Sequence, residues 1–350
     1  MSTALWRTMR GALLALGLTA ASVCAGQTDA LAQGKTRLTV YTALDTDQLA
    51  AFKKAAEADV PNIDIVWVRE GTGVVASRII AERNNPRADL IWGLAVTSVI
   101  MLEERGLIEP YTPKDASELD PAFVDDKKPM AWTGMDAYLS VICFNTIEAA
   151  KKNIPAPKTW DDLLKPVYQN EIVMPNPASS GAGYLAVSAW LQKRGNDAGW
   201  AYLDALHKNI AVYTHSGSAS CVQAARGERV VGIGFDMRAA SEKTKGAPID
   251  IIIPTDGIGW EMEATAIVKG TKNLDAAKAL ADWTVSKKAN ELYSKYFPIV
   301  ARSDVKNLPK NYPQEARGAM IKNDLRWAAT NNQAIIAEWT KRYDGKSAPK

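Results

Sequence analysis

Glu171-Ile-Val-Met-Pro-Asn-Pro-Ala-Ser-Ser-Gly-Ala-Gly-Tyr184 joins an apolar run to a segment of small and polar residues. Residues 171–174 predict a short buried strand, and residues 184–192 place apolar side chains at helical spacing. The hydroxyl and small residues between them lie where the strand gives way to the helix. This transition is the first indication of an α/β fold.

The start of this helix predicts an anion site. The first N–H groups of a helix lack intrahelical partners and carry the positive end of its dipole. Ser179 and Ser180 add hydroxyl donors, and Gly181 lets a ligand approach the backbone. The segment therefore favours binding of phosphate, phosphonate or carboxylate. The alternative is that Ser180 serves only as the helix N-cap.

A first series of alternating elements covers the N-terminal part of the chain. It predicts strands at residues 37–41, 63–68 and 88–92 and helices at 45–58, 74–84 and 96–105. Such alternation produces a parallel sheet covered by helices, and ligands gather at the carboxyl ends of its strands. We therefore expect three strand ends to face one cleft, namely residues 41–43, 69–72 and 92–93.

A second series follows a candidate crossing strand at 138–144. It predicts strands at 171–174, 210–213, 230–235, 249–253 and 263–268. It predicts helices at 181–193, 197–207, 218–225, 274–285 and 287–296, and a C-terminal helical block at 313–343. We therefore predict two lobes with a ligand cleft between them. Lobe I comprises residues 33–137 and 264–310, and lobe II comprises 138–263 and 311–350.

Residues 1–32 have the features of a secretory signal peptide. Arg7 and Arg10 precede an apolar region at 11–26, and Ala30-Leu-Ala32 is a cleavage site. The apolar region is too short to span a membrane. We expect a soluble periplasmic protein. The net charge of +3 over 350 residues is too balanced for binding to nucleic acid or a membrane surface.

Cysteines and histidines offer little chemistry. Cys143 and Cys221 remain after cleavage, and each can be either a disulfide partner or a small core residue. His207 and His215 do not have the spacing of a zinc motif. No Gly-x-Ser-x-Gly elbow and no nucleophile–base set is visible, so we expect neither enzymatic activity nor a metal or cofactor.

Four phrases resemble a known family: residues 102–111, 157–163, 175–183 and 296–302. Through them the whole mature chain resembles the periplasmic solute-binding proteins of ABC importers. The resemblance is to the ferric-ion-binding branch with the type II fold, and within it to the 2-aminoethylphosphonate-binding proteins.

The resemblance implies two lobes, each a mostly parallel sheet flanked by helices, that close on a small solute. It implies delivery of the solute to an ABC permease in the inner membrane, and we expect the protein to be a monomer. It places the family's anion site on Ser180-Gly181-Ala182 and a second contact region on Ser216-Gly217-Ser218.

One departure from the family changes the expected ligand. Ferric-binding relatives carry adjacent tyrosines where this chain has Asp236-Met237, and a histidine where it has Leu44-Asp45. Carboxylates there suit an ammonium group, so we expect a pocket with an anion end and a cation end. The candidate ligand-binding residues are Tyr41, Thr42, Asp45, Glu70, Thr72, Trp92, Ser179, Ser180, Gly181, Ala182, Ser216, Ser218, Asp236, Trp260 and Glu261. Helix capping remains an alternative for Asp45 and Asp236, as does simple packing for Trp260.

The sequence thus predicts the substrate-binding component of an ABC importer, with 2-aminoethylphosphonate as the solute. The same fold could instead bind Fe(III) with an anion, thiamine, a polyamine or a phosphate ester. A secreted hydrolase is the less favoured alternative from another class.

Overall fold

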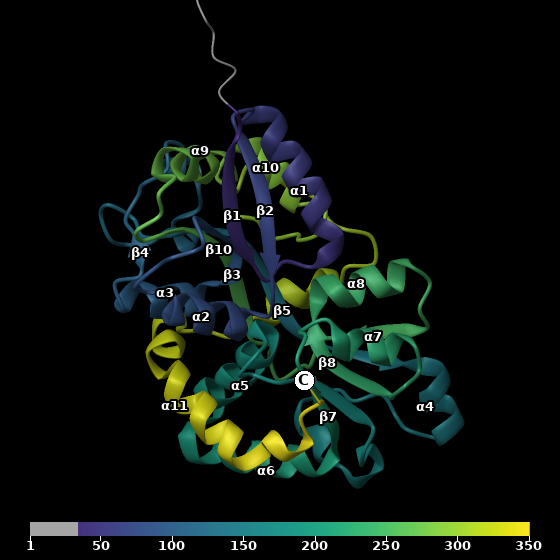
Figure 1. The fold of residues 1–350 in the computed structure, drawn as a ribbon. Helices are drawn as coiled ribbons and strands as arrows, with labels where there is room; N and C mark the ends of the chain where they lie inside the picture. Colours follow the sequence, from purple (N-terminus) through teal and green to yellow (C-terminus); the bar gives the residue numbers. More distant parts are fainter. Residues whose placement is uncertain (1–33, 350) are drawn as a thin grey trace, which may run out of the picture. The chain divides into compact units, whose positions relative to one another are not determined.

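In the computed structural model, which describes residues 34–349, ten strands form one continuous sheet (Figure 1). Their order is β2-β1-β3-β10-β5-β8-β6-β7, with β4 beside β10 and β9 beside β5. The predicted signal peptide, residues 1–32, lies outside the described residues. No helix within residues 34–349 combines the length and hydrophobicity needed to cross a membrane.

The first half of the sheet contains the three parallel strands of the first predicted series. These are β1 (Thr36–Thr42), β2 (Ile63–Arg69) and β3 (Leu90–Ala95), and the short β4 (Ile108–Glu109) pairs with β10. The connecting helices are α1 (Thr46–Asp59), α2 (Thr72–Ala81) and α3 (Val96–Glu104). Helix α1 packs with α9 (Leu274–Thr284) and α10 (Lys287–Tyr293), whereas α2 packs with α3.

Two long antiparallel strands occupy the centre of the sheet. β5 (Thr133–Asn145) pairs with β10 (Trp260–Val268) through its first half, up to Leu139. From Ser140 onward β5 pairs instead with β8 and β9. β5 therefore joins the two halves of the sheet.

The second half contains β6 (Ile172–Pro175), β7 (Ile210–Thr214), β8 (Val231–Phe235) and β9 (Ile249–Ile252). β6 is parallel to both β7 and β8. The helices are α4 (Thr146–Lys152), α5 (Gly181–Arg194), α6 (Asn196–Asn209), α7 (Ala219–Ala225) and α8 (Asp236–Thr244). The predicted α/β fold class is confirmed, with parallel strands in each half and antiparallel pairing at the centre.

The C-terminal region is helical over a shorter range than the sequence predicted. Helix α11 (Leu325–Tyr343) packs against α3 and α5, and a 3-10 helix covers Gln314–Ala319. The residues between them are extended because Ile321 donates its N–H to the carbonyl of Ile258, at 3.0 Å. Other 3-10 helices cover Ala116–Glu118, Pro121–Phe123, Asp161–Leu164, Pro166–Tyr168 and Asp344–Lys346.

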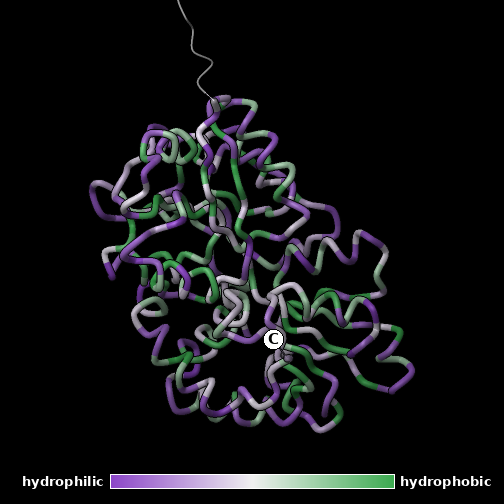
Figure 2. The backbone as a smooth tube through the Cα atoms, in the orientation of Figure 1, coloured by the Kyte–Doolittle hydropathy of each residue, from purple (hydrophilic) through white to green (hydrophobic). Residues whose placement is uncertain are grey.

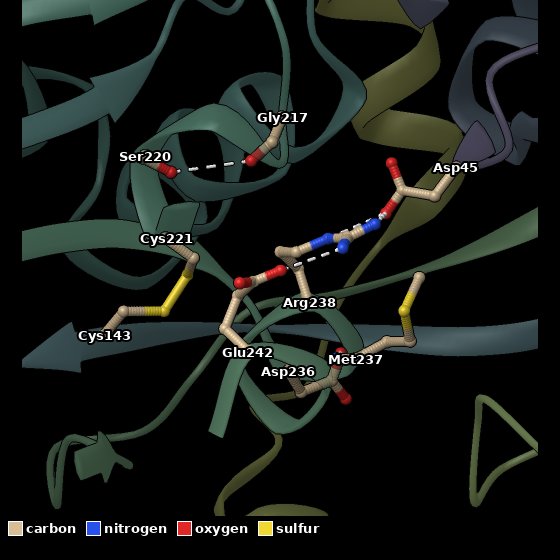
Figure 3. Close-up of a disulfide and its surroundings, with 9 residues drawn as sticks. All are labelled: Asp45, Cys143, Gly217, Ser220, Cys221, Asp236, Met237, Arg238 and Glu242. Atoms are coloured by element: carbon tan, nitrogen blue, oxygen red, sulfur yellow. Dashed lines mark hydrogen bonds and ion pairs between the residues drawn. A yellow bond between two sulfur atoms is a disulfide. The ribbon is translucent and has the colours of Figure 1, made fainter. Parts of the chain in front are cut away.

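The strands carry the hydrophobic core, and the outer loops are mostly hydrophilic (Figure 2). Cys143 on β5 and Cys221 on α7 form a disulfide, with their Cα atoms 5.3 Å apart and both side chains buried (Figure 3). The alternatives left open by the sequence are therefore not exclusive, because both cysteines also belong to a small apolar cluster with Val141 and Ala224. The disulfide ties α7 to the strand that joins the two halves.

Candidate functional site

A cavity of about 180 Å³ lies at the carboxyl ends of the parallel strands. Its lining follows β1, β2 and β3 in the first half of the sheet and β6, β7 and β8 in the second. The lining residues are Ala43, Asp45, Gln48, Arg69, Glu70, Gly71, Thr72, Ala95, Tyr138, Ser180, Gly181, Ala182, His215, Ser216, Gly217, Ser218, Phe235, Met237 and Glu263. This is the edge at which α/β sheets bind ligands.

The N-terminus of α5 forms one wall of the cavity. Ser180 is the N-cap residue, and its Oγ accepts a hydrogen bond from the N–H of Gly183 at 3.3 Å. The N–H groups of Gly181 and Ala182 belong to the first turn, so they have no intrahelical partner. A 14-residue helix thus directs free donors and its positive dipole end toward the cavity.

The N-terminus of α2 lies beside that of α5. The N–H of Gly73 donates to the carbonyl of Ser179 at 3.2 Å. The contact requires glycine, because a Cβ on Gly71 or Gly73 would overlap the carbonyl oxygens of Ser179 and Ala178. A Cβ on Gly181 would lie 2.8 Å from Oγ1 of Thr72, so the two helix starts adjoin.

Arg69 adds a positive charge at the end of β2. Its Nε donates to the carbonyl of Leu44 at 3.0 Å, and its Nη2 lies 3.6 Å from Oδ1 of Asp45. The side chain is about one third exposed, at 31%. Arg69 and the two helix N-termini together make one side of the cavity electropositive.

Asp45 is the N-cap residue of α1, and both of its carboxylate oxygens have partners. Ser218 donates its hydroxyl to Oδ1 at 2.6 Å, and Arg238 on α8 donates to Oδ2 (Figure 3). Gln48 accepts from the N–H of Asp45 through Oε1, at 2.9 Å. The Nε2 of Gln48 is buried without a hydrogen-bond partner among the described residues, so it is a donor available to a ligand.

The cavity also contains acidic groups. Glu263 on β10 lines it, and the fully buried Asp136 occupies the opposed position on β5. Burial raises the pKa of Asp136 well above its ordinary value, and the charges of Glu263 and Asp236 raise it further. Burial and the charge of Asp45 likewise raise the pKa of Glu263. The cavity therefore combines electropositive groups with a carboxyl group that has no hydrogen-bond partner for its Oε2 among the described residues.

Tyr138 contributes a neutral hydroxyl to the same cavity. A Cβ on Gly181 would lie 3.2 Å from its hydroxyl oxygen. Burial raises the pKa of Tyr138 well above its ordinary value, and the charges of Glu261 and Glu263 add to the shift. The side chain is therefore a hydroxyl donor rather than a phenolate.

Eight of the fifteen residues predicted from the sequence line this cavity. They are Asp45, Glu70, Thr72, Ser180, Gly181, Ala182, Ser216 and Ser218. Ser179 lies next to the cavity, where its hydroxyl donates to the carbonyl of His215 at 3.1 Å. The remaining six have other surroundings.

Trp92 lies inside β3, because that strand continues to Ala95. Its ring packs against Phe52, with the centroids 5.6 Å apart, and against Trp67 at 5.2 Å. In the neighbouring strand, Tyr41 is buried and donates its hydroxyl to Glu82 at 2.9 Å. Thr42 accepts from the N–H of Leu44 at 3.0 Å.

Asp236 is the first residue of α8 and is fully buried. Its Oδ2 accepts from the hydroxyl of Tyr312, and its Oδ1 accepts from the N–H of Met237 at 2.8 Å. Burial raises the pKa of Asp236 to about 6. The structure thus gives Asp236 protein partners and leaves it outside the cavity lining.

Trp260 and Glu261 also lie outside the lining. The indole of Trp260 donates to the carbonyl of Ile321 at 3.1 Å. Glu261 is buried, and its Oε2 accepts from the hydroxyl of Thr97 at 2.7 Å. Burial raises the pKa of Glu261 to about 7.

Several lining residues were not among the predicted ones, chiefly Gln48, Arg69, Tyr138, His215, Phe235, Met237 and Glu263. Two of them had a signal in the sequence. Arg69 stands in a predicted strand end, and Glu263 lies two positions after Glu261, on the same face of β10. Which of these two glutamates reaches the cavity depends on the pairing of β10 with its neighbours.

A larger cavity, of about 850 Å³, lies elsewhere, among Trp132, Gln192, Asn323 and Trp327. The helix start at its rim is already capped, because Asp324 accepts from the N–H of Trp327 at 2.9 Å. It also lies away from the carboxyl ends of the parallel strands. The smaller cavity has the free donors and charges of a solute site.

The comparison with known proteins begins with the family match. Residues 85–324 match the family described as bacterial extracellular solute-binding protein. A Haemophilus influenzae protein named only as uncharacterized is 31% identical over 317 residues, which make up 89% of this chain and 91% of that protein. A Sinorhizobium fredii protein, provisionally named an ABC transporter periplasmic-binding protein, is 30% identical over 286 residues, 80% of this chain and 77% of that protein.

Three further proteins differ in what their names record. A Salmonella typhimurium periplasmic protein, provisionally named for binding 2-aminoethylphosphonate, is 26% identical over 311 residues, 84% of this chain and 86% of that protein. The structure of AfuA from Actinobacillus pleuropneumoniae, with exogenous fructose-6-phosphate bound, has a TM-score of 0.84 at 29% identity, over 89% of this chain and 99% of that chain. Iron-bound HitA from Pseudomonas aeruginosa has a TM-score of 0.73 at 19% identity, over 87% of this chain and 99% of that chain. At this identity the likeness shows the fold alone.

Proposed function

Because the chain belongs to the bacterial extracellular solute-binding protein family, we propose that it is the solute-binding component of an ABC importer and binds a small phosphonate. The family consists of transport proteins rather than enzymes. Our first candidate solute is 2-aminoethylphosphonate, a zwitterion with an anionic and a cationic end. The observation that carries the proposal is a cavity lined both by paired helix N-termini and by Glu263, whose Oε2 is buried without a hydrogen-bond partner among the described residues.

The phosphonate end is expected at the starts of α2 and α5. Free N–H groups of Gly181 and Ala182, the hydroxyls of Thr72 and Ser180, and the charge of Arg69 converge there. Hydrogen bonds from such donors to a charged oxygen are stronger than neutral ones. Ser216 and Ser218 line the same cavity from the loop after β7.

The ammonium end is expected at Glu263. A buried cation needs a carboxylate partner to offset its desolvation. Glu263 lines the cavity, and its Oε2 has no hydrogen-bond partner within residues 34–349. Asp236, the partner expected from the sequence, is instead bonded to Tyr312, so we assign the role to Glu263.

A sugar phosphate is the second candidate. The likeness to AfuA favours it, because that structure holds fructose-6-phosphate at 29% identity to this chain. Sugar hydroxyls could donate to Glu263 and accept from the free Nε2 of Gln48. A carboxyl group and an amide are suitable partners for hydroxyls.

An Fe(III) ligand has less support from the cavity. The one tyrosine among the lining residues is Tyr138, whose raised pKa opposes the phenolate form that would bind Fe(III). Among residues 34–349, no group of three histidine, cysteine, aspartate or glutamate side chains is placed to hold a metal ion.

The proposed mechanism is closure of two lobes around the solute. We retain the division into residues 33–137 with 264–310 and 138–263 with 311–350. In this division the start of α2 belongs to lobe I and the start of α5 to lobe II, so a bound anion contacts both and favours the closed state. We also propose that the mature protein acts in the periplasm as a monomer and delivers its solute to an inner-membrane permease.

Thermal unfolding of the mature protein with four separate ligands tests the proposal. A ligand that binds only the native state stabilises it by about 2.7 kcal/mol at a hundred times its Kd. We expect 2-aminoethylphosphonate to raise Tm more than ethylphosphonate, which lacks the amine. A rise with fructose 6-phosphate alone would favour the second candidate. A rise with Fe(III) alone would show that the phosphonate proposal is wrong.

A further inference from the structure

Asp136 and Glu263 form an acid pair at the base of the cavity. They occupy directly opposed positions on the antiparallel strands β5 and β10. Opposed residues project from the same face of a sheet, with Cβ atoms about 4.5–5.5 Å apart. Glu263 reaches the cavity, whereas Asp136 is 0% exposed. A ligand group in contact with Glu263 is therefore also close to the carboxyl group of Asp136.

Neither carboxyl group has a compensating partner in the described part of the chain. Both Oδ atoms of Asp136 and Oε2 of Glu263 are buried without a hydrogen bond. Ionising both of two adjacent buried carboxyl groups costs free energy, because desolvation and the repulsion between two negative charges both favour the protonated form of one group. The geometry of the pair thus favours one retained proton.

The groups around the pair do not supply a positive charge. Arg69, which lines the same cavity, and Arg238 on α8 are both paired with Asp45. Burial and neighbouring acids raise the pKa of both members of the pair. The titratable groups whose charges couple to the pair are Asp45 at the start of α1, Tyr138 on β5, Asp236 on α8 and Tyr293 on α10.

We propose that Asp136 and Glu263 share one proton in the ligand-free protein and that an ammonium group of the solute displaces it. This rests on the proposed function, since a phosphonate must first occupy the helix N-termini. The step balances: the singly charged pair accepts the ammonium, becomes doubly charged and releases one proton to solvent. A sugar phosphate brings hydroxyls but no cation, so it leaves the proton in place. The pair therefore selects for a cationic solute and couples its binding to pH.

Calorimetry in buffers of different ionisation enthalpy measures the released proton. At pH 7, we expect 2-aminoethylphosphonate to release close to one proton more than ethylphosphonate, which shares the phosphonate and lacks the amine. Asp136→Asn is expected to reduce this difference while retaining binding, because the variant removes the carboxyl group with which Glu263 shares the proton and keeps Glu263 itself. Glu263→Gln is expected to lower the affinity for 2-aminoethylphosphonate at least tenfold and to change the affinity for ethylphosphonate little.

Infrared spectroscopy of the ligand-free protein provides a test that needs no ligand. We expect a protonated carboxyl band at pH 7 that is reduced in both Asp136→Asn and Glu263→Gln. Asp125→Asn is a matched control, because Asp125 is also fully buried but accepts from Ala131 at 2.9 Å and pairs with Arg326. It should leave the band unchanged.

The outcomes separate the two levels of the proposal. If neither variant reduces the infrared band, the proposal that Asp136 and Glu263 share a proton is wrong. If both phosphonates bind with equal proton release, the displacement is wrong and the phosphonate receptor stands. If neither phosphonate binds, the proposed function fails and the displacement by a bound aminophosphonate fails with it, whereas the infrared result still decides whether the proton is shared.

Discussion

Arg238 on α8 donates two hydrogen bonds to Oδ2 of Asp45, from Nη2 at 2.6 Å and from Nε at 3.2 Å (Figure 3). Both side chains are less than one tenth exposed. The pair joins a helix of the second half of the sheet to the N-cap of α1 in the first half. It therefore ties the two halves together at the rim of the proposed solute cavity.

Replacing Arg238 with Gln is expected to lower the free energy of unfolding by about 3–5 kcal/mol. The reason is that the variant removes the shorter ion pair of the buried Asp45 and leaves Asp45 only the more distant Arg69, at 3.6 Å. Denaturant unfolding measures the loss. Lys243→Gln on the same helix is the control, because its pair with Asp250 is exposed and is expected to contribute less than about 1 kcal/mol. Equal effects of the two variants would contradict the role of the buried pair.

Replacing Ser180 with Ala is expected to reduce 2-aminoethylphosphonate affinity roughly tenfold to a hundredfold. A hydrogen bond to a charged oxygen contributes about 1.5–3 kcal/mol, and stability should fall by only about 1 kcal/mol through the lost cap. Calorimetry and denaturant unfolding give the two values. Ser286→Ala removes the cap of α10, where Ser286 accepts from Ala289 at 3.1 Å, and should leave affinity unchanged. A loss of stability without a loss of affinity in Ser180→Ala would make that serine a cap alone.

Replacing Arg69 with Gln is expected to lower the affinity for both phosphonates at least tenfold and to reduce the dependence of that affinity on salt concentration. The charge of Arg69 attracts the anion, and such attraction is screened by added ions. Titrations at two ionic strengths measure the effect. Arg78→Gln serves as the control, because Arg78 lies on α2 and its charge pairs with Glu82. A salt dependence equal to that of the wild type would place Arg69 outside the anion site.

Stability is expected to decrease as pH rises from 5 to 8. Burial raises the native pKa of Glu261 to about 7 and that of Asp236 to about 6. In this range the native state binds more protons than the unfolded state, so the slope of unfolding free energy against pH is negative. The raised pKa of Glu261 corresponds to a decrease in the free energy of unfolding on the order of 3 kcal/mol as pH rises through its titration range.

Chemical denaturation at several pH values measures this slope. Glu261→Gln should make it less negative, whereas Glu338→Gln on the surface of α11 should leave it nearly unchanged. Stability that rises steadily from pH 5 to 8 would contradict the prediction.

Removing the disulfide through the Cys143→Ser and Cys221→Ser double variant is expected to cost about 4 kcal/mol. The crosslink spans 78 residues and restricts the unfolded chain over that loop. Unfolding of the wild type under reducing conditions should show a similar loss. No difference between oxidised and reduced protein would mean that the bond contributes nothing to stability.

The sequence by itself determined the alternation of strands and helices and the start of α5 at Gly181. These features depend on residues close in the chain. Apolar periodicity defines each strand and helix, and Ser180 with Gly181 and Ala182 marks the helix terminus where an anion can bind. The strand that crosses at 138–144 was also visible, although β5 begins earlier, at Thr133.

Only the tertiary structure decided which polar side chains reach the cavity. Trp92 is the third of the six residues of β3 rather than its last, and Asp236 accepts a hydrogen bond from Tyr312, 76 residues away. Glu263 lines the cavity, whereas Glu261 is bonded to Thr97, 164 residues away. Local pattern gives the face of a strand on which a residue lies. Its depth and its partners depend on the packing of residues far apart in the chain, which no local pattern encodes.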